Sequence, residues 1–195
     1  MPISQRFLED FDKKEIKKEF GLKDNLKTIL FFAGGRMGLA RKNIFEYMQT
    51  LANIKENIQI VAVSGKNKKV YERFKQIAEN KENIKVLEFT NKVPELMRIS
   101  DLVITKPGGI TSSEALASNV PILAINPIPG QEEENAEFLE ENKVAIWLKP
   151  KDKLQEKLKE VLKDKTLNNL KENTKKLGNA NSAKEICENI LKTMV

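Results

Sequence analysis

The most distinctive stretch of the chain reads DLVITKPGGITSSEAL and runs from Asp101 to Leu116. An apolar run typical of a strand leads into Pro107-Gly108-Gly109, and a helix start rich in hydroxyl groups follows. Glycine lets the backbone approach an anion closely, and a helix start offers unpaired N–H groups with a partial positive charge. The pattern indicates a place where backbone amides receive a phosphate or a diphosphate.

Two roles are open for Glu114, which follows this turn. Thr111-x-x-Glu114 has the spacing of a capping box, in which the Thr111 side chain caps the helix and the Glu114 carboxylate accepts from the Thr111 N–H. Alternatively, the carboxylate points into a crevice and accepts hydrogen bonds from two vicinal sugar hydroxyls. The helix is about two turns long, because Asn119 suits a left-handed C-cap and Pro121 follows it.

A second polar segment, PIPGQEEENA, runs from Pro127 to Ala136. Three consecutive glutamates at a helix start favour the helix dipole, which is a structural role. Gln131 and Asn135 are four residues apart and share a helix face, so their amides also suit sugar hydroxyls. Both interpretations stay open on spacing alone.

A third candidate is the loop FAGGRMGL, which contains Gly34 and Gly35. A tight strand-to-helix turn explains it as well as an anion site does. The loop lacks the G-x-G-x-x-G spacing of dinucleotide-binding proteins, and no acidic residue ends the second predicted strand, which reads VAVSG. A nicotinamide or flavin dinucleotide is therefore disfavoured.

Six short apolar runs alternate with helical periodicity, which is typical of a parallel sheet covered on both faces. The predicted strands are 28–32, 58–63, 84–89, 102–105, 121–125 and 144–148. The predicted helices are 12–20, 40–51, 68–79, 93–99, 111–117, 132–141, 154–162 and 183–192. This is an α/β, Rossmann-like, doubly wound parallel sheet with a default strand order of 3-2-1-4-5-6. The candidate loops then meet at the carboxyl ends of the strands, near the switch point of the sheet, where ligands bind in such folds.

The length of 195 residues fits one domain, 1–195, without a disulfide or metal to hold it together. Residues 1–11 lack periodicity and are interpreted as a connector, whereas 150–195 form C-terminal helices with a turn at Gly178 and 179–181. The single Cys187 is expected to be a buried, inert thiol in a reducing compartment. No run approaches the ~20 apolar residues of a membrane span, so any membrane association is expected to be peripheral.

Charge and residue counts exclude several functions. The chain has no His, which removes Ser-His-Asp and Cys-His nucleophiles, His-ligated zinc and the commonest neutral-pH base. The net charge of +6 is concentrated in the tail: residues 149–195 hold 12 basic and 7 acidic side chains, whereas 1–148 hold 22 and 21. The tail has no aromatic residue or Arg, so nucleic acid is not an expected partner.

Taken together, these segments resemble the C-terminal, nucleotide-sugar-binding domain of GT-B glycosyltransferases. The similarity is to the glycolipid-forming group that includes monogalactosyldiacylglycerol synthase and processive diacylglycerol glucosyltransferases, relatives of the peptidoglycan N-acetylglucosaminyltransferase. It rests on DLVITKPGGITSSE (101–114), Val120-Pro121 and NPIPGQEEENA (126–136), with support from FTNKVPELM (89–97) and the Gly34-Gly35 loop. It spans most of residues 1–148, and the resemblance implies one half of a GT-B fold.

The resemblance also implies a UDP-sugar site. Its uracil would lie against the backbone from Phe89 to Val93, its diphosphate at the two glycine turns, its ribose at Glu114, and its hexose at the start of the helix after Gly130. The implied residues are Gly34, Gly35, Arg36, Phe89, Val93, Pro107, Gly108, Gly109, Ile110, Thr111, Glu114, Gln131, Glu132 and Asn135. No catalytic residue, metal ligand or cofactor is implied, because helix dipoles and backbone amides handle the diphosphate charge in this family.

The implied function is to bind a UDP-hexose for an inverting transferase that glycosylates a lipid such as diacylglycerol. In the family, an N-terminal domain supplies the acceptor site and the base, often a His, and the final helix crosses back to it. The chain is therefore expected to be inactive alone, and to be either an excised half or a subunit that meets a separate acceptor subunit. The intact enzyme is expected in the cytoplasm, at the inner face of the membrane. The alternatives are a UDP-N-acetylglucosamine 2-epimerase-like isomerase and the noncatalytic subunit of a split glycosyltransferase, and the sequence does not select the hexose or acceptor.

Overall fold

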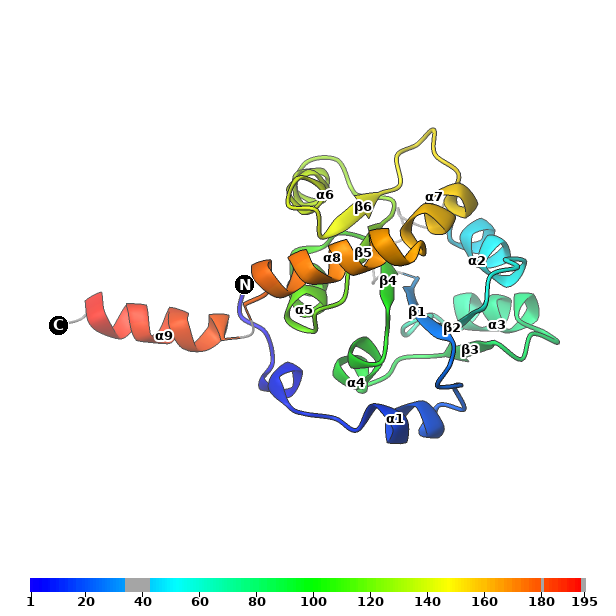
Figure 1. Cartoon of the computed structure of the whole chain (residues 1–195), viewed down its shortest axis with the longest axis horizontal. Coiled ribbons are helices and arrows are strands. Elements are labelled where there is room, and N and C mark those ends of the chain that lie inside the picture. Colours follow the sequence, from blue (N-terminus) through cyan, green and yellow to red (C-terminus); the bar gives the residue numbers. More distant parts are fainter. Residues whose placement is uncertain (34–42, 180, 194–195) are drawn as a thin grey trace.

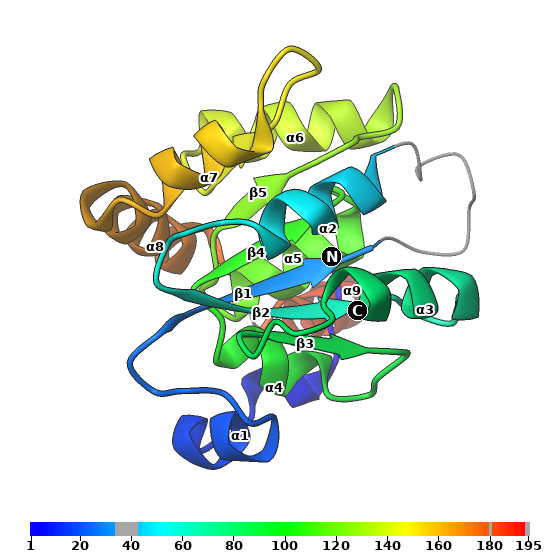
Figure 2. The same cartoon turned by 90° about the vertical axis from the view of Figure 1, so that its right-hand side faces the viewer.

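The computed structural model describes residues 1–33, 43–179 and 181–193, and its centre is a parallel sheet of six strands (Figures 1 and 2). The order β3-β2-β1-β4-β5-β6 confirms the predicted topology. The strands are β1 (Lys27–Phe32), β2 (Ile58–Val63), β3 (Ile84–Leu87), β4 (Leu102–Thr105), β5 (Ile122–Ala124) and β6 (Ala145–Trp147). Every residue of β2 and β4 is buried, as expected for strands covered on both faces.

A buried glutamine interrupts the apolar residues of β2, and its amide is fully hydrogen-bonded. Gln59 in β2 is 2% exposed, and its Nε2 donates to the Lys23 carbonyl at 2.8 Å and to Thr28 Oγ1 at 2.9 Å. Its Oε1 accepts from the Lys23 N–H at 2.8 Å. A buried amide is tolerated only when it is satisfied in this way, so Gln59 fixes the segment that enters β1.

Helices form a layer on each face of the sheet. Phe31, Met48 and Phe74 lie in the cluster beneath α2, α3 and α7, whereas Leu30, Leu96 and Ala115 lie in the cluster beneath α1, α4, α5 and α6. Helix α8 contacts both α7 and α5 and so joins the two layers. The helices are η1 (Gln5–Leu8), α1 (Lys13–Glu19), α2 (Ile44–Ala52), α3 (Lys68–Ile77), α4 (Val93–Arg98), α5 (Gly109–Ala117), α6 (Gln131–Glu141), α7 (Leu154–Val161), α8 (Asp164–Leu177) and α9 (Ser182–Thr193).

The N-terminal residues are more structured than their lack of periodicity indicates. The 3-10 turn η1 contacts α4 and α5, and its Phe7 is 4% exposed. Asp12 caps α1 by accepting from the Lys14 N–H at 2.8 Å, and Gly21 follows with a φ of 66°, which agrees with the predicted helix stop. Residues 1–11 therefore pack against the domain.

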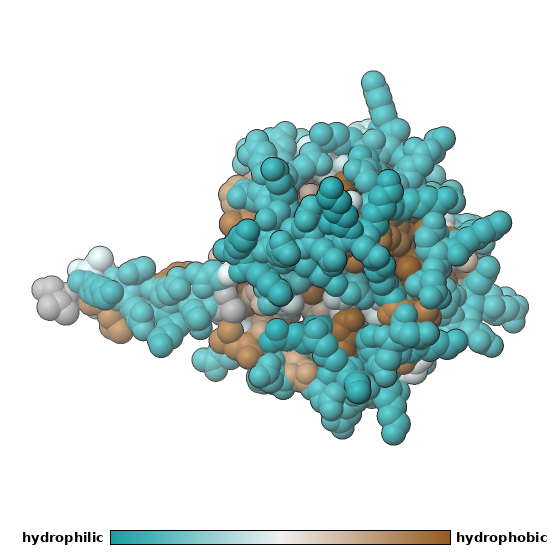
Figure 3. All heavy atoms as spheres, viewed as in Figure 1, coloured by the Kyte–Doolittle hydropathy of each residue, from teal (hydrophilic) through white to brown (hydrophobic). Residues whose placement is uncertain are grey.

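The C-terminal helix α9 projects away from the rest of the molecule (Figure 1). It buries none of its residues, and apolar groups are visible among hydrophilic ones along it in Figure 3. The expectation of a buried Cys187 is wrong for this reason, because the thiol lies on the exposed helix. Within the described ranges, no helix has the length and apolar character needed to cross a membrane.

Several predicted boundaries next to the candidate site differ from the structure by one or two residues. Strand β3 ends at Leu87 and not at 89, because the chain bends at Glu88 and Phe89. Helix α5 begins at Gly109 and not at 111. The predicted helix 40–51 corresponds to α2, whose described part begins at Ile44, and residues 40–42 lie outside the described ranges.

Candidate functional site

The loops after β4 and β5 are bonded to each other at the carboxyl edge of the sheet. Asn135 Nδ2 donates to the Pro107 carbonyl at 2.9 Å. Lys106 Nζ lies 3.6 Å from Glu132 Oε2. The two polar segments singled out in the sequence therefore form one site, although their residues lie far apart along the chain.

The start of α5 decides between the two roles of Glu114. Gly108 is the N-cap, with φ −68° and ψ 142°, and no side chain caps the helix. Thr111 is consequently the third residue of the helix and cannot be its N-cap. The capping-box interpretation is wrong, because the N-cap is Gly108, three residues before the position that a capping box with Glu114 requires.

Neither glycine of this turn is needed by the fold. Gly108 and Gly109 have no positive φ. A Cβ added at Gly108 would have Glu132 Oε1 as its nearest neighbour at 3.9 Å, which is ordinary contact. A Cβ at Gly109 would meet the Sδ of Met1 at 2.6 Å, the far part of a flexible side chain. The absence of side chains at these two positions leaves room at the helix start, and the flexible side chain of Met1 lies over Gly109 in this room.

The two helix starts at this edge differ in charge. The first turn of α5 holds no acidic residue, so its N–H groups are available to an anion. The first turn of α6 holds three glutamates; Glu133 Oε2 accepts from the Gly130 N–H at 3.4 Å, and Glu132 Oε2 accepts from the Ile128 N–H at 2.8 Å. The glutamates of α6 therefore have the predicted structural role of stabilising the start of their own helix. The start of α5 is a better anion site than the start of α6.

Glu114 follows the open helix start by one turn. It lies four residues after Ile110, which is 58% exposed, so the two side chains are neighbours on one helix face. Burial raises the pKa of the Glu114 carboxyl above its ordinary value. The Glu114 side chain makes no hydrogen bond to another residue in the described part of the chain. A partly desolvated carboxylate of this kind is typical of a functional group.

The loop between β3 and α4 carries the other predicted contacts. Phe89 is 58% exposed, and Lys66 Nζ lies 4.9 Å from the centroid of its ring. Val93 is the first residue of α4 and packs partly against the core. The loop therefore presents an aromatic face with a cation beside it, at a distance from α5 because β2, β1 and β4 lie between.

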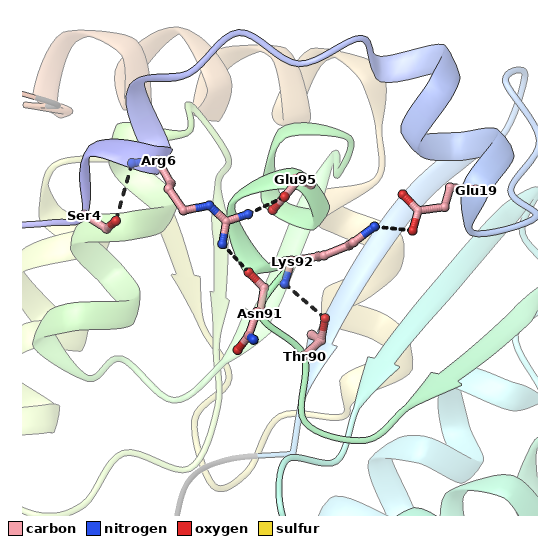
Figure 4. A network of polar contacts seen from close by, with 7 residues as sticks. All are labelled: Ser4, Arg6, Glu19, Thr90, Asn91, Lys92 and Glu95. Carbon is pink, nitrogen blue, oxygen red and sulfur yellow. Dashed lines mark hydrogen bonds and ion pairs between the residues drawn. The ribbon is translucent and has the colours of Figure 1, made fainter.

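The N-terminal segment holds this loop in place (Figure 4). Arg6 Nη1 donates to the Asn91 carbonyl at 2.7 Å, and its Nη2 pairs with Glu95 in α4. Lys92 pairs with Glu19 of α1, and the Lys92 N–H donates to Thr90 Oγ1 at 3.1 Å. Since η1 also contacts α5, it connects the loop to the helix start described above.

The structure thus brings most of the predicted site residues to one edge. Pro107 and Gly108 lie beside Asn135 and Glu132, and Glu114 follows in α5. Gln131 is exposed at the first position of α6. Gly34, Gly35 and Arg36 lie outside the described residues. No cluster of three His, Cys, Asp or Glu that could hold a metal occurs within 1–33, 43–179 and 181–193.

Sequence reasoning missed three cations around this edge. Lys106 pairs with Glu132, Lys66 lies over Phe89, and Arg6 holds Asn91. Lys106 stands inside the conspicuous glycine motif and could have been selected. The other two have partners distant in sequence, and no local spacing connects them.

Comparison with known proteins assigns a family to this arrangement. A family model described as glycosyltransferase family 28 C-terminal domain matches residues 28–190. The processive diacylglycerol beta-glucosyltransferase of Bacillus subtilis strain 168 is 40% identical over 194 residues, which cover 98% of this chain and 50% of that protein. The chain spans about half the length of the curated relatives it matches.

Solved structures share the fold at lower identity. The MurG structure from Acinetobacter baumannii aligns with a TM-score of 0.73 at 17% identity, covering 95% of this chain and 55% of that one. A putative UDP-N-acetylglucosamine 2-epimerase from Listeria monocytogenes aligns with a TM-score of 0.73 at 19% identity, covering 95% of this chain and 49% of that one. These likenesses support the Rossmann-like half of a GT-B architecture and the resemblance noted in the sequence. With the family match over most of its length, the chain belongs to the glycosyltransferase family 28 C-terminal domain.

Proposed function

We propose that this chain binds a UDP-hexose and presents it for transfer to a lipid acceptor such as diacylglycerol. The observation that carries the proposal is the start of α5, which no side chain caps, with two glycines of ordinary backbone conformation and Glu114 one turn later. The name of the Bacillus subtilis relative, 40% identical, supplies the reaction class.

In this proposal each part of the donor meets a different element. The diphosphate lies at the N–H groups from Gly109 to Thr111, and the ribose hydroxyls donate to Glu114. The uracil lies against the loop from Phe89 to Val93. The hexose lies beside Gln131, Glu132 and Asn135. No protein-bound metal or cofactor is required, because the helix dipole and backbone amides balance the diphosphate charge.

The contribution of this chain to the reaction is to position the donor and to stabilise the leaving group. An acceptor hydroxyl attacks the anomeric carbon from the face opposite the diphosphate, so the configuration inverts, and the bond from that carbon to the diphosphate oxygen breaks. Negative charge then grows on the departing UDP. The N–H groups of α5 are preorganised toward that charge, which is an effective form of electrostatic catalysis.

The acceptor site and the base are proposed to lie outside these residues. The chain has no His to serve as a base near neutral pH. We therefore propose that transfer needs an acceptor-binding domain or subunit, at the cytoplasmic membrane face where the lipid acceptor is found. A diacylglycerol assay with UDP-glucose and this chain alone is expected to give no glucolipid, and turnover by the purified chain would contradict this part of the proposal.

Calorimetry with nucleotides tests donor binding directly. UDP is expected to bind and ADP to bind at least tenfold more weakly, because the uracil site is built from the fixed backbone of the Phe89 loop. A screen of UDP-glucose, UDP-galactose and UDP-N-acetylglucosamine then identifies the hexose. Absence of UDP binding would overturn the proposal.

The alternative functions make different predictions. An epimerase shares the fold, as the Listeria monocytogenes structure illustrates, and would convert UDP-N-acetylglucosamine to its 2-epimer without an acceptor. A noncatalytic subunit would bind its partner without UDP affinity. Glucosyltransferase relatives at 40% identity favour the transferase over both.

A further inference from the structure

The loop between β5 and α6 begins with an unusual backbone conformation. Asn126 lies two residues after the end of β5 and has a φ of 44°, in the left-handed region that favours glycine. Pro127 follows it, and a proline favours an extended backbone at the residue before it. Two effects therefore oppose the backbone of Asn126, and such a conformation persists only where the surrounding structure holds it.

The side chain of Asn126 is held from another element. Tyr47 Oη donates to Asn126 Oδ1 at 3.0 Å, across 79 positions of the chain. Tyr47 is the fourth residue of α2, and its ring packs against the core cluster that contains Met48 and Leu51. Because protein cores are closely packed, this ring places its hydroxyl at a fixed point. The hydrogen bond therefore fixes the beginning of the loop to α2.

The rest of the loop is held mainly by side chains. The Ile125 N–H still donates to β4, but in the described part of the chain no backbone–backbone hydrogen bond involves residues 126–129. At the far end, N–H groups of the loop donate to Glu132 and Glu133, which belong to α6. The loop is thus bonded to α6 at its far end and, through Asn126, to α2 at its near end.

The course of this loop sets the position at which α6 begins. Gly130 is the N-cap of α6, and Gln131 is its first residue. Only the four residues 127–130 separate Asn126 from Gln131, and two of them are prolines with a fixed φ. A change in the backbone of Asn126 would therefore move the start of α6, because the short connection has little freedom to absorb it.

We propose that Tyr47 is a positioning residue for the donor hexose and that it acts through Asn126. The inference rests on the proposed function, in which the hexose lies beside Gln131, Glu132 and Asn135. The hydroxyl of Tyr47 keeps Asn126 left-handed, and this backbone places the start of α6 against the hexose. Groups that recognise a ligand need such support, because small displacements weaken their hydrogen bonds. The proposed diphosphate site lies on α5, so the effect is on the sugar and not on the nucleotide.

Calorimetry with UDP and with UDP-glucose on the same variants tests this inference. Tyr47→Phe removes the hydroxyl and keeps the ring. It is expected to weaken UDP-glucose binding about threefold to tenfold, which corresponds to one hydrogen bond, and to leave the Kd for UDP unchanged. Tyr71→Phe is the matched control, because it removes the hydroxyl of the other tyrosine, on α3, and it should leave both affinities unchanged.

Substitutions at position 126 test whether Tyr47 acts through this residue. Asn126→Gly removes the acceptor but adopts the left-handed backbone freely, whereas Asn126→Ala removes the acceptor and disfavours that backbone. Asn126→Ala should therefore weaken UDP-glucose binding more than Asn126→Gly does. When Tyr47→Phe is added to Asn126→Gly, no further loss is expected, because the hydroxyl no longer has its acceptor.

The outcomes separate this inference from the proposed function. A wild type that binds neither UDP nor UDP-glucose would overturn the proposed function and the role of Tyr47 with it. Binding of both by the wild type, with unchanged UDP-glucose affinity in Tyr47→Phe, would overturn this inference alone. Equal losses for UDP and UDP-glucose in Tyr47→Phe would indicate a general structural role and contradict the positioning of the hexose. Additive losses in the double variant would refute the action through Asn126.

Discussion

Replacing Glu114 by glutamine should weaken nucleotide binding without weakening the fold. In the proposed complex the carboxylate accepts hydrogen bonds from two ribose hydroxyls, and hydrogen bonds to a charged group contribute about 1.5–3 kcal/mol. Glutamine keeps one acceptor oxygen, and Glu114 is only partly buried, so the lower part of that range applies. A loss of about 1.5–2 kcal/mol corresponds to a Kd for UDP that is about 10- to 30-fold weaker.

The same substitution should raise the free energy of unfolding, although it weakens UDP binding, because burial raises the pKa of Glu114 in the folded chain. Below the ordinary value of 4.5 the carboxyl is protonated in both the folded and the unfolded chain, so it contributes nothing. As the pH rises, the unfolded chain ionises first, and the folded state binds more protons, so the free energy of unfolding falls until the pH passes the folded pKa. Glutamine removes this penalty. Relative to the wild type, Glu114→Gln should therefore gain stability between pH 4 and pH 7.

Two measurements on the same samples check this reasoning. Calorimetry gives the Kd for UDP, and urea unfolding at pH 4 and pH 7 gives the free energies. Glu137→Gln, an exposed carboxylate on α6, is the matched control and should change neither quantity. An unchanged Kd in Glu114→Gln would refute the ribose contact, and a variant less stable than the wild type at pH 7 would refute the claim that Glu114 is held at a cost to the fold.

Three further changes test the elements around Glu114. Gly108→Ala should keep wild-type stability in thermal unfolding, because its Cβ would make only an ordinary contact, 3.9 Å from Glu132 Oε1. It should weaken UDP binding at least tenfold in calorimetry by filling the approach to α5, and equal UDP affinity would remove the diphosphate from this turn. Arg6→Ala should weaken UDP binding several-fold by loosening the Phe89 loop, and amide hydrogen exchange from Thr90 to Val93 should speed up; unaltered exchange would show that Arg6 does not hold the loop. Gly178→Ala should destabilise the chain in urea unfolding, because its Cβ would lie 2.4 Å from the Leu116 carbonyl oxygen. Overpacking of this kind costs about 1–3 kcal/mol. Asn179→Ala is the control, and equal stability of the two variants would contradict the close contact.

The strands and their order could be predicted from the sequence because their signal is local. Runs such as IQIVAV and LVIT are buried throughout, and short apolar runs between helical stretches identify them without knowledge of the rest of the chain. The handedness rule for parallel strands then leaves few topologies. The predicted ends of the helices were less accurate than the strands, as the start of α5 shows. Gly108 and Thr111 are both residue types that can be an N-cap, and the sequence does not indicate which of the two begins the helix.

The parts of the site that depend on distant residues could not be predicted. Glu114 and Asn135 were selected from their spacing, but the bond from Asn135 to Pro107 joins residues 28 positions apart. The contact of Arg6 with Asn91 joins residues 85 apart, within a segment that has no periodic pattern. Exposure could not be predicted from residue type either. Cys is usually buried, yet Cys187 is exposed, because no described residue of its helix is buried.

The starts of α5 and α6 differ in charge, and this difference would orient the proposed donor. A diphosphate placed at α6 would meet three carboxylates that already satisfy the dipole and two nearby N–H groups, whereas α5 offers bare N–H groups and no acidic residue in its first turn. The anionic end of the donor is therefore favoured at α5 and repelled from α6. The hexose carries no charge, and its hydroxyls can donate to carboxylates such as Glu132. The glutamates of α6 stabilise their own helix. In the proposed complex they also exclude the diphosphate, and so they orient the sugar away from α5.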